Sequence, residues 1–154
     1  MRMNLRLAAL AAVAATFGCP GFLAGSAAAH EMEKLTVVER ATSDTVTDTG
    51  AKSDSVGDVL TFANEIYDNA DKVKVGSDNG SCIRTVVGKA WECTFTVMLD
   101  KGQISVEGPY YDSADSVMSV IGGTGEFDKV RGEMKLHARD EKGSAYDFVF
   151  SLLK

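Results

Sequence analysis

The segment Gln103–Lys135, QISVEGPYYDSADSVMSVIGGTGEFDKVRGEMK, decides the fold class of this chain of 154 residues. Its short apolar runs alternate with polar residues at every second position, which is the pattern of β-strands. Gly108-Pro109, the polar residues 112–115 and the glycine cluster 122–125 interrupt these runs, and such residues supply the backbone conformations of turns. The segment therefore predicts an antiparallel meander. Sheets of this kind avoid exposed edges by closing into barrels.

Strand signals of the same kind recur along the rest of the chain. Residues 41–56 are rich in Thr, Ser, Asp and Gly, which predicts a solvated loop between the first two strands. Eight strands are expected, the number at which a barrel is filled by side chains or holds one small ligand. The fold class is thus all-β, an eight-stranded antiparallel barrel. The predicted strands are Lys34–Ala41, Val59–Tyr67, Ser81–Val87, Ala90–Leu99, Gln103–Glu107, Ser116–Ile121, Gly132–Arg139 and Ala145–Leu153.

Residues 1–29 have the composition of a secretory signal peptide. Arg2 and Arg6 precede a short apolar run, and three alanines stand before His30 as a cleavage site. The apolar run is too short for a membrane span, and a lipid anchor on Cys19 is the alternative interpretation. We therefore expect one barrel domain at residues 30–154, secreted or periplasmic, with no membrane association after cleavage.

The charge of the mature chain argues against several classes of partner. Without the two arginines of the signal, 14 basic residues face 22 acidic ones, a net charge of −8. This balance disfavours nucleic acid and anionic membrane surfaces. The acids are spread through separate turns without a calcium-loop pattern, and the glycine cluster lacks the following Lys of a phosphate-binding loop. We predict neither a metal site nor a cofactor.

Two cysteines remain after cleavage, Cys82 and Cys93, in the hairpin SCIRTVVGKAWEC. A tight turn near Gly88 would place them opposite each other on one face of the sheet, and exported proteins retain disulfides. A shift of the strand pairing by one residue would instead put the thiols on opposite faces. A disulfide and a pair of small buried hydrophobic residues are both compatible with the sequence.

Two polar residues interrupt apolar strand faces. Alternation places Glu39 on the face of Leu35 and Val37, and Asn64 on the face of Phe62. A carboxyl group in an apolar interior is costly unless it is paired, and burial raises its pKa, so such groups are candidates for a site. The alternative is that Glu39 and Asn64 satisfy each other or the backbone near an open end of the barrel.

Several motifs resemble known families. The run VIGGTGEFDKVRG, residues 120–132, resembles the glycine-rich signature of plant dirigent proteins. The ordered set GDVLTFANEIYD at 57–68, the segment around residues 102–125 and MKLHARD at 134–140 is similar to the allene oxide cyclase family. The resemblance implies an eight-stranded antiparallel barrel, an apolar small-molecule ligand and assembly as a homotrimer.

The resemblance also implies roles for individual residues. Glu39 matches an inward glutamate that steers charge as the substrate's epoxide opens, and Asn64 matches an asparagine that holds an ordered water. Cys82 matches a residue that lines the cavity, Phe62 belongs to the apolar substrate wall, and Thr47 stands where the family has a water-binding serine. Two positions depart from the family pattern, since Ala41 replaces an asparagine and Asp48 a proline.

Three functions follow as hypotheses. The first is a cyclase or isomerase that controls the conformation of an apolar substrate, with Glu39 as the catalytic residue and Asn64 as its hydrogen-bonding partner. The alternative is a non-catalytic dirigent-like or ligand-carrier barrel. The third is an interaction protein whose barrel is filled by its own side chains.

Overall fold

The structure, a computed structural model, describes residues 32–153; the expected signal peptide lies outside this range. The described chain forms nine strands and a single turn of 3₁₀ helix, η1, and contains no helix that could span a membrane. The elements are β1 (Met32–Arg40), β2 (Thr45–Thr47), β3 (Val59–Asp68), β4 (Lys74–Val86), β5 (Ala90–Leu99), β6 (Gly102–Tyr111), β7 (Ser116–Gly123), η1 (Gly125–Phe127), β8 (Arg131–Ala138) and β9 (Ala145–Leu153).

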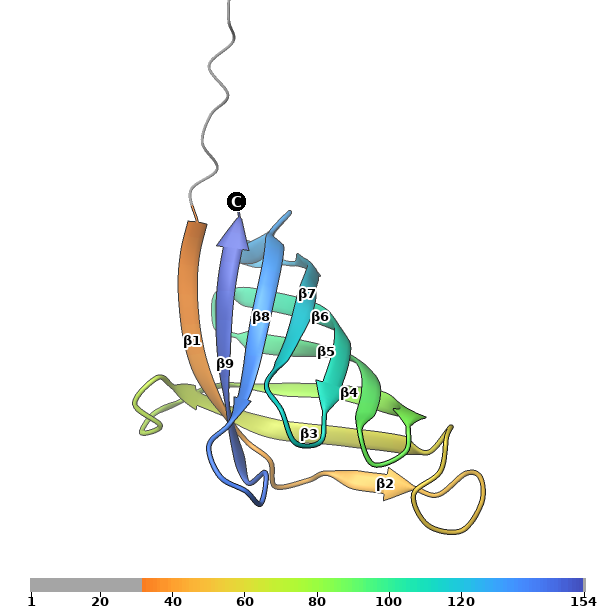
Figure 1. Ribbon diagram of the computed structural model, residues 1–154. Coiled ribbons are helices and arrows are strands. Elements are labelled where there is room, and N and C mark those ends of the chain that lie inside the picture. The colour runs from red at the N-terminus through yellow and green to blue at the C-terminus, as the bar shows by residue number, and fades with distance from the viewer. Residues whose placement is uncertain (1–31, 154) are drawn as a thin grey trace, which may run out of the picture.

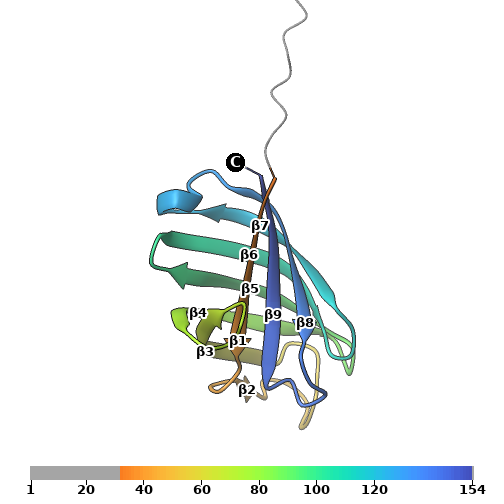
Figure 2. The ribbon, with the colours of Figure 1, turned by 90° about the vertical axis from the view of Figure 1, so that its left-hand side faces the viewer.

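Eight of these strands close an antiparallel barrel, which confirms the predicted fold class. Each strand from β3 to β9 pairs with the next, and β1 closes the ring by pairing with β9 on one side and β3 on the other. In Figure 1, β1, β9 and β8 run steeply across the direction of β3 and β4, and Figure 2 shows the same crossing from the side. The inward side chains of both walls fill the space between them.

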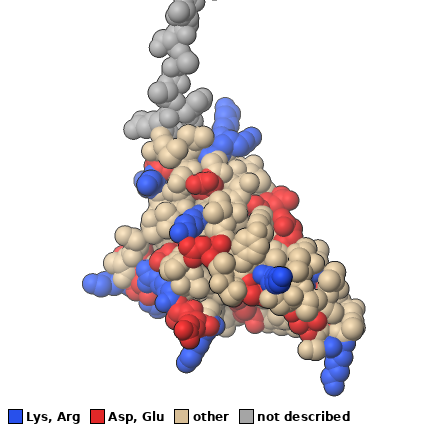
Figure 3. Space-filling model, in the orientation of Figure 1, with Lys and Arg blue, Asp and Glu red and all other residues tan. Residues whose placement is uncertain are grey.

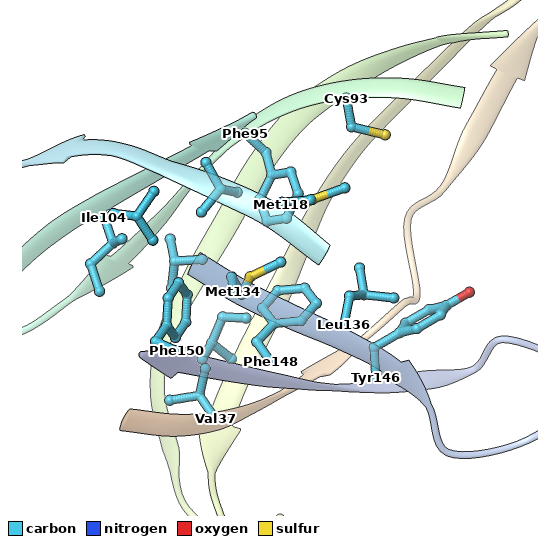
Figure 4. Close-up of a cluster of buried hydrophobic side chains, with 14 of the residues drawn as sticks. Val37, Cys93, Phe95, Ile104, Met118, Met134, Leu136, Tyr146, Phe148 and Phe150 are labelled. Atoms are coloured by element: carbon cyan, nitrogen blue, oxygen red, sulfur yellow. The ribbon is translucent and has the colours of Figure 1, made fainter. Parts of the chain in front are cut away.

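The core consists of apolar residues that alternate along the strands. Three aromatic rings lie in contact within it, with Phe95 tilted against Phe148 at 5.6 Å and edge-on to Phe62 at 5.5 Å between ring centroids. Figure 4 shows these inward side chains from β5, β7, β8 and β9 meeting in one cluster, with Tyr146 at its end. Fully buried members include Val97, Ile104, Val106, Met134, Phe150 and Leu152.

The structure differs from the predicted secondary structure in two places. The region expected to be a loop contains the short strand β2, which continues along the same edge of β3 that β1 occupies. Strand β4 begins at Lys74 and not at Ser81, because its polar, glycine-containing first half pairs with both β3 and β5. Tertiary pairing overrides the weak strand propensity of Gly, Asp and Asn here.

The Gly108-Pro109 pair does not form the expected turn. Both residues lie within β6, opposite Cys93 and Glu92 of β5. Proline is tolerated here because β7 pairs with β6 only through Ile104–Glu107, so the far edge of β6 is unpaired beside Pro109. The second glycine cluster does end a strand, since β7 stops at Gly123 and η1 begins at Gly125.

The cysteines lie opposite each other in the β4–β5 hairpin and form a disulfide, with 4.0 Å between their Cα atoms. Replacing both Cys82 and Cys93 with alanine is expected to lower the free energy of unfolding by about 3 kcal/mol, since the bond restricts a short loop of the unfolded chain. Urea unfolding with and without reductant measures this. A reductant effect that persists in the double variant would contradict it.

Arg84 of β4 is a buried charged residue. Its guanidinium carbon lies 3.9 Å from the centre of the Trp91 ring, and its nitrogens approach carboxyl oxygens of Asp54 and Asp112 within 2.7 Å. These acids belong to the β2–β3 and β6–β7 connections, so one side chain fastens two loops to the same end of the barrel. Elsewhere acidic and basic side chains are interspersed over the face seen in Figure 3.

Candidate functional site

A cavity of about 80 Å³ lies inside the barrel, at the end where the β6–β7 and β8–β9 connections meet. Its wall is mostly apolar and includes the Cys82–Cys93 disulfide. Among the described residues that line it, Glu39 and Asp44 carry carboxyl groups, and none carries a basic group. The remaining lining residues are Leu60, Phe62, Phe95, Tyr110, Met118, Leu136, Tyr146 and Phe148.

Asn64 of β3 holds the polar side of this cavity together. Its side-chain nitrogen donates to Glu39 Oε1 at 2.9 Å and to Asp44 Oδ1 at 2.8 Å. Its side-chain oxygen accepts the backbone N–H groups of Thr42 at 2.9 Å and Ser43 at 3.0 Å. Both donor hydrogens of the carboxamide and its acceptor are therefore in use within the protein.

The break between β1 and β2 explains why Asn64 is needed there. Both strands pair with the same edge of β3, and residues 41–44 leave that edge between them. The Asn64 side chain accepts two N–H groups of this break, while the Ser43 hydroxyl bonds to both the N–H and the carbonyl of Ala63. Side chains thus replace the missing ladder bonds, and the break directs Asp44 toward the cavity.

A second buried carboxyl group, Asp78 of β4, lies beside Glu39. Asp78 is opposite Asn64 in the β3–β4 register, and its Oδ1 accepts the Asn64 backbone N–H at 3.1 Å. No N–H or hydroxyl group of the described residues donates to its buried Oδ2. The Glu39 and Asp78 carboxyl groups interact directly, and this interaction raises the pKa of Glu39 and lowers that of Asp78, which is the effect expected when Glu39 carries the shared proton.

Burial of the two carboxyl groups and the repulsion between their negative charges both favour the protonated form of Glu39. Desolvation, followed by the negative charge of Asp78, raises the pKa of Glu39 well above its ordinary value. Desolvation raises the pKa of Asp78 to about 6. No cation is among the groups that shift either pKa value. The raised pKa favours the protonated form of Glu39, and a carboxylic acid that faces an apolar cavity is the arrangement of a general acid.

The shared proton predicts an unusual dependence of stability on pH. Because both folded pKa values lie above those of the unfolded chain, the pair stabilises the fold at about pH 4, and this contribution is lost as the pH rises through about 6. Asp78→Asn keeps the Oδ1 acceptor and gives Glu39 a donor. The variant is expected to be more stable than wild type by about 2 kcal/mol at pH 8 and equal to it near pH 4.

Denaturant unfolding of both proteins across this range measures the difference. Subtracting the two curves removes the opposite trend of the acids Asp68, Asp115 and Asp140, whose pKa values are lowered by hydrogen bonds. A difference that does not change with pH would show that Glu39 and Asp78 share no proton.

The structure brings most of the predicted site residues together. Glu39, Phe62, Cys82 and Cys93 line the cavity, and Asn64 lies directly behind it, bonded to Glu39. Thr47 is not among the lining residues and lies exposed on β2.

Sequence reasoning missed three residues of the site: Asp78, Asp44 and Tyr146. Asp78 lies between two of the predicted strands, Val59–Tyr67 and Ser81–Val87, although alternation back from Cys82 through residue 80 places it on the inward face. No pattern in the sequence pairs Tyr146 with Tyr110. Asp44 could not be found, because its position depends on the break between β1 and β2.

The structure is a closed antiparallel barrel with an apolar cavity and two buried carboxyl groups at one end, and a barrel of eight strands is wide enough to hold one small ligand. The sequence matches the allene oxide cyclase family over residues 27–140. The chain therefore belongs to that family, and the resemblance seen in its motifs is confirmed.

Solved structures of several activities share the fold. A pyocyanin demethylase is 25% identical with a TM-score of 0.66, and the match covers 77% of this chain and 99% of that one. A pterocarpan synthase dirigent protein is 14% identical with a TM-score of 0.63, covering 79% and 93%. The Diels-Alderase AbmU from Streptomyces koyangensis is 12% identical with a TM-score of 0.63, covering 84% and 71%. The last two likenesses concern the fold alone.

Proposed function

We propose that this protein is an enzyme of the cyclase or isomerase type, which holds a compact apolar substrate at one end of its barrel and transfers a proton to it from Glu39. The observation that carries the proposal is the buried Glu39 carboxyl group, which accepts a hydrogen bond from Asn64, faces an apolar cavity and has a raised pKa beside Asp78. The 25% identity to an enzyme named for a small-molecule substrate, pyocyanin, supports a catalytic function.

Each residue of the site has its own role in the proposed reaction. The apolar wall, including Phe62 and Phe95, holds the substrate and excludes water. Glu39 donates its proton to an oxygen or nitrogen of the substrate, and Asp78 stabilises the acid form beforehand through their shared bond. Asn64 fixes the Glu39 carboxyl group and thus acts as a positioning residue. Confinement of the substrate in one conformation supplies the rest of the rate enhancement.

A non-catalytic ligand carrier is the second candidate, and one observation favours it. The Asn64 carboxamide has no free donor, because both its hydrogens bind Glu39 and Asp44. The polar cluster then serves to bridge the break between β1 and β2, and the cavity binds a ligand without changing it.

Under either function, we infer that residues 1–29 direct export to a secreted or periplasmic location, and that the barrel assembles as a homotrimer.

Extraction of bound molecules tests the proposal. The full-length chain is expressed in a host that exports it, the protein is purified from the exported fraction, and small molecules released by denaturation are identified by mass spectrometry. An apolar molecule that the fresh protein converts to an isomer supports an enzyme. A molecule that binds and is recovered unchanged after long incubation supports the carrier. If no molecule is recovered and the interior of the barrel also contains no water, the result would favour the third hypothesis, a barrel filled by its own side chains.

A further inference from the structure

Tyr110 and Tyr146 stand between two hollows at the same end of the barrel. Both line the inner cavity, and both also line an outer hollow of about 590 Å³ formed by the β6–β7 and β8–β9 connections. Their hydroxyl oxygens lie 2.8 Å apart, and their rings meet edge to face at 6.0 Å. Figure 4 shows the Tyr146 hydroxyl directed away from Phe148, toward this end of the barrel.

The pair has one hydrogen-bond donor left over. Two hydroxyl groups carry two protons, and the bond between them uses one, whichever of the two is the donor. Neither hydroxyl makes another hydrogen bond within the described residues. Burial raises the pKa values of both tyrosines, so both remain protonated at neutral pH. A half-buried donor without an acceptor is a group that a ligand can satisfy.

The volumes of the inner cavity and the outer hollow indicate how much of a ligand lies on the outer side of the tyrosine pair. Small-molecule pockets usually have about 300–1,000 Å³, whereas the inner cavity has about 80 Å³. A ligand that reaches Glu39 therefore extends past the tyrosine pair into the outer hollow, whose volume is within the usual range. The spare hydroxyl proton lies beside the middle of such a ligand.

We propose that the Tyr110–Tyr146 pair is the polar recognition element of the ligand site, and that it donates its spare hydroxyl proton to an acceptor atom of the ligand. The ligand class is thus an apolar compound that carries a hydrogen-bond acceptor, such as a carbonyl oxygen or a ring nitrogen, with its apolar end against Phe62 and Phe95. The proposal rests on the proposed function, because it identifies the substrate class of that cavity.

Matched bicyclic probes test this class. 1-Tetralone carries a carbonyl acceptor and tetralin lacks it, while their ring systems are otherwise the same. The protein is labelled with 3-fluorotyrosine, whose four ¹⁹F resonances come from Tyr67, Tyr110, Tyr111 and Tyr146 and are assigned by Tyr→Phe variants. Titration with 1-tetralone is expected to shift the resonances of Tyr110 and Tyr146. Tyr67 is the internal control, since it lies outside the cavity and donates to Glu65.

The Tyr→Phe variants are expected to show a pattern of affinities for the two probes that a pair with a purely structural role would not give. Tyr110→Phe or Tyr146→Phe leaves one hydroxyl whose proton is then free to donate, so each single variant is expected to bind 1-tetralone within about twofold of wild type. The double variant has no donor and is expected to bind it about fivefold more weakly, the size of one neutral hydrogen bond. The affinity for tetralin is expected to be unchanged throughout.

Two outcomes would overturn the proposal. One is equal weakening of 1-tetralone and tetralin in the double variant, which would show that the pair only maintains the shape of the cavity. The other is the absence of shifts at Tyr110 and Tyr146 when 1-tetralone reaches its solubility limit. Because this binding measurement involves no turnover, it can fail while the proton transfer proposed for Glu39 holds, and the reverse.

Discussion

Glu39→Gln is expected to lower turnover of the molecule extracted from the protein by about 100-fold or more, the usual effect of removing a general acid. Glutamine has nearly the same shape as a protonated glutamic acid, so its oxygen can still accept from Asn64 and its amide can donate to Asp78. The variant has no proton that it can transfer. The fold and the cavity are expected to remain, and only the chemical step is expected to fail.

Steady-state kinetics with the extracted molecule measures the effect, and the control is Glu107→Gln on the exposed face of β6. The control is expected to leave turnover within about twofold of wild type. The Glu39 variant is also expected to keep the affinity for the molecule, so the loss should be in kcat and not in KM. Equal turnover in wild type and Glu39→Gln would remove Glu39 from catalysis and favour the carrier.

Asn64→Ala is expected to cause the largest loss of stability among single substitutions, about 4 kcal/mol. The change removes the donors of two carboxyl groups and the acceptor of two backbone N–H groups, and each buried group left without a partner costs about 1–3 kcal/mol. Part of this cost is recovered because water reaches the exposed residues 42–44.

Chemical denaturation at pH 7 measures this loss, with Asn79→Ala as the matched control. Asn79 is the neighbour of Asp78 on β4, but its side chain is exposed and contacts only the Met98 sulfur, at 3.9 Å. The control is expected to change stability by less than about 0.5 kcal/mol. A similar small change in Asn64→Ala would show that the break between β1 and β2 is held by other contacts.

The fold could be predicted from the sequence because its strongest signal is local. Alternation of polar and apolar residues predicted the strands on both sides of Gly88, and the glycine cluster predicted the end of β7. Whether Cys82 and Cys93 face each other stayed open in the sequence, because it depends on the register of the hairpin. The same rule placed Glu39 and Asn64 on inward faces, where both are buried. A period of two is sufficient for such assignments because every residue of a strand faces one side or the other.

The missing parts of the site depend on register, which alternation does not determine. Asp78 lies beside Glu39 only because β4 extends to Lys74 and pairs with β3 in a particular alignment. Asp44 enters the cavity only because β1 and β2 share one edge of β3. Tyr110 and Tyr146 come from strands that are not neighbours in the sheet, so their contact follows from the closure of the barrel.

The pairing of β1 with β9 has a consequence for the synthesis of the chain. Met32 lies opposite Leu153, so the first and last described strands complete the ring together. While a ribosome is still making β9, the β1 edge facing it has no partner, and the strands already made can form only an open sheet. Closure therefore requires β9, and until that strand has been made the nascent chain exposes an unpaired strand edge that favours association with other chains.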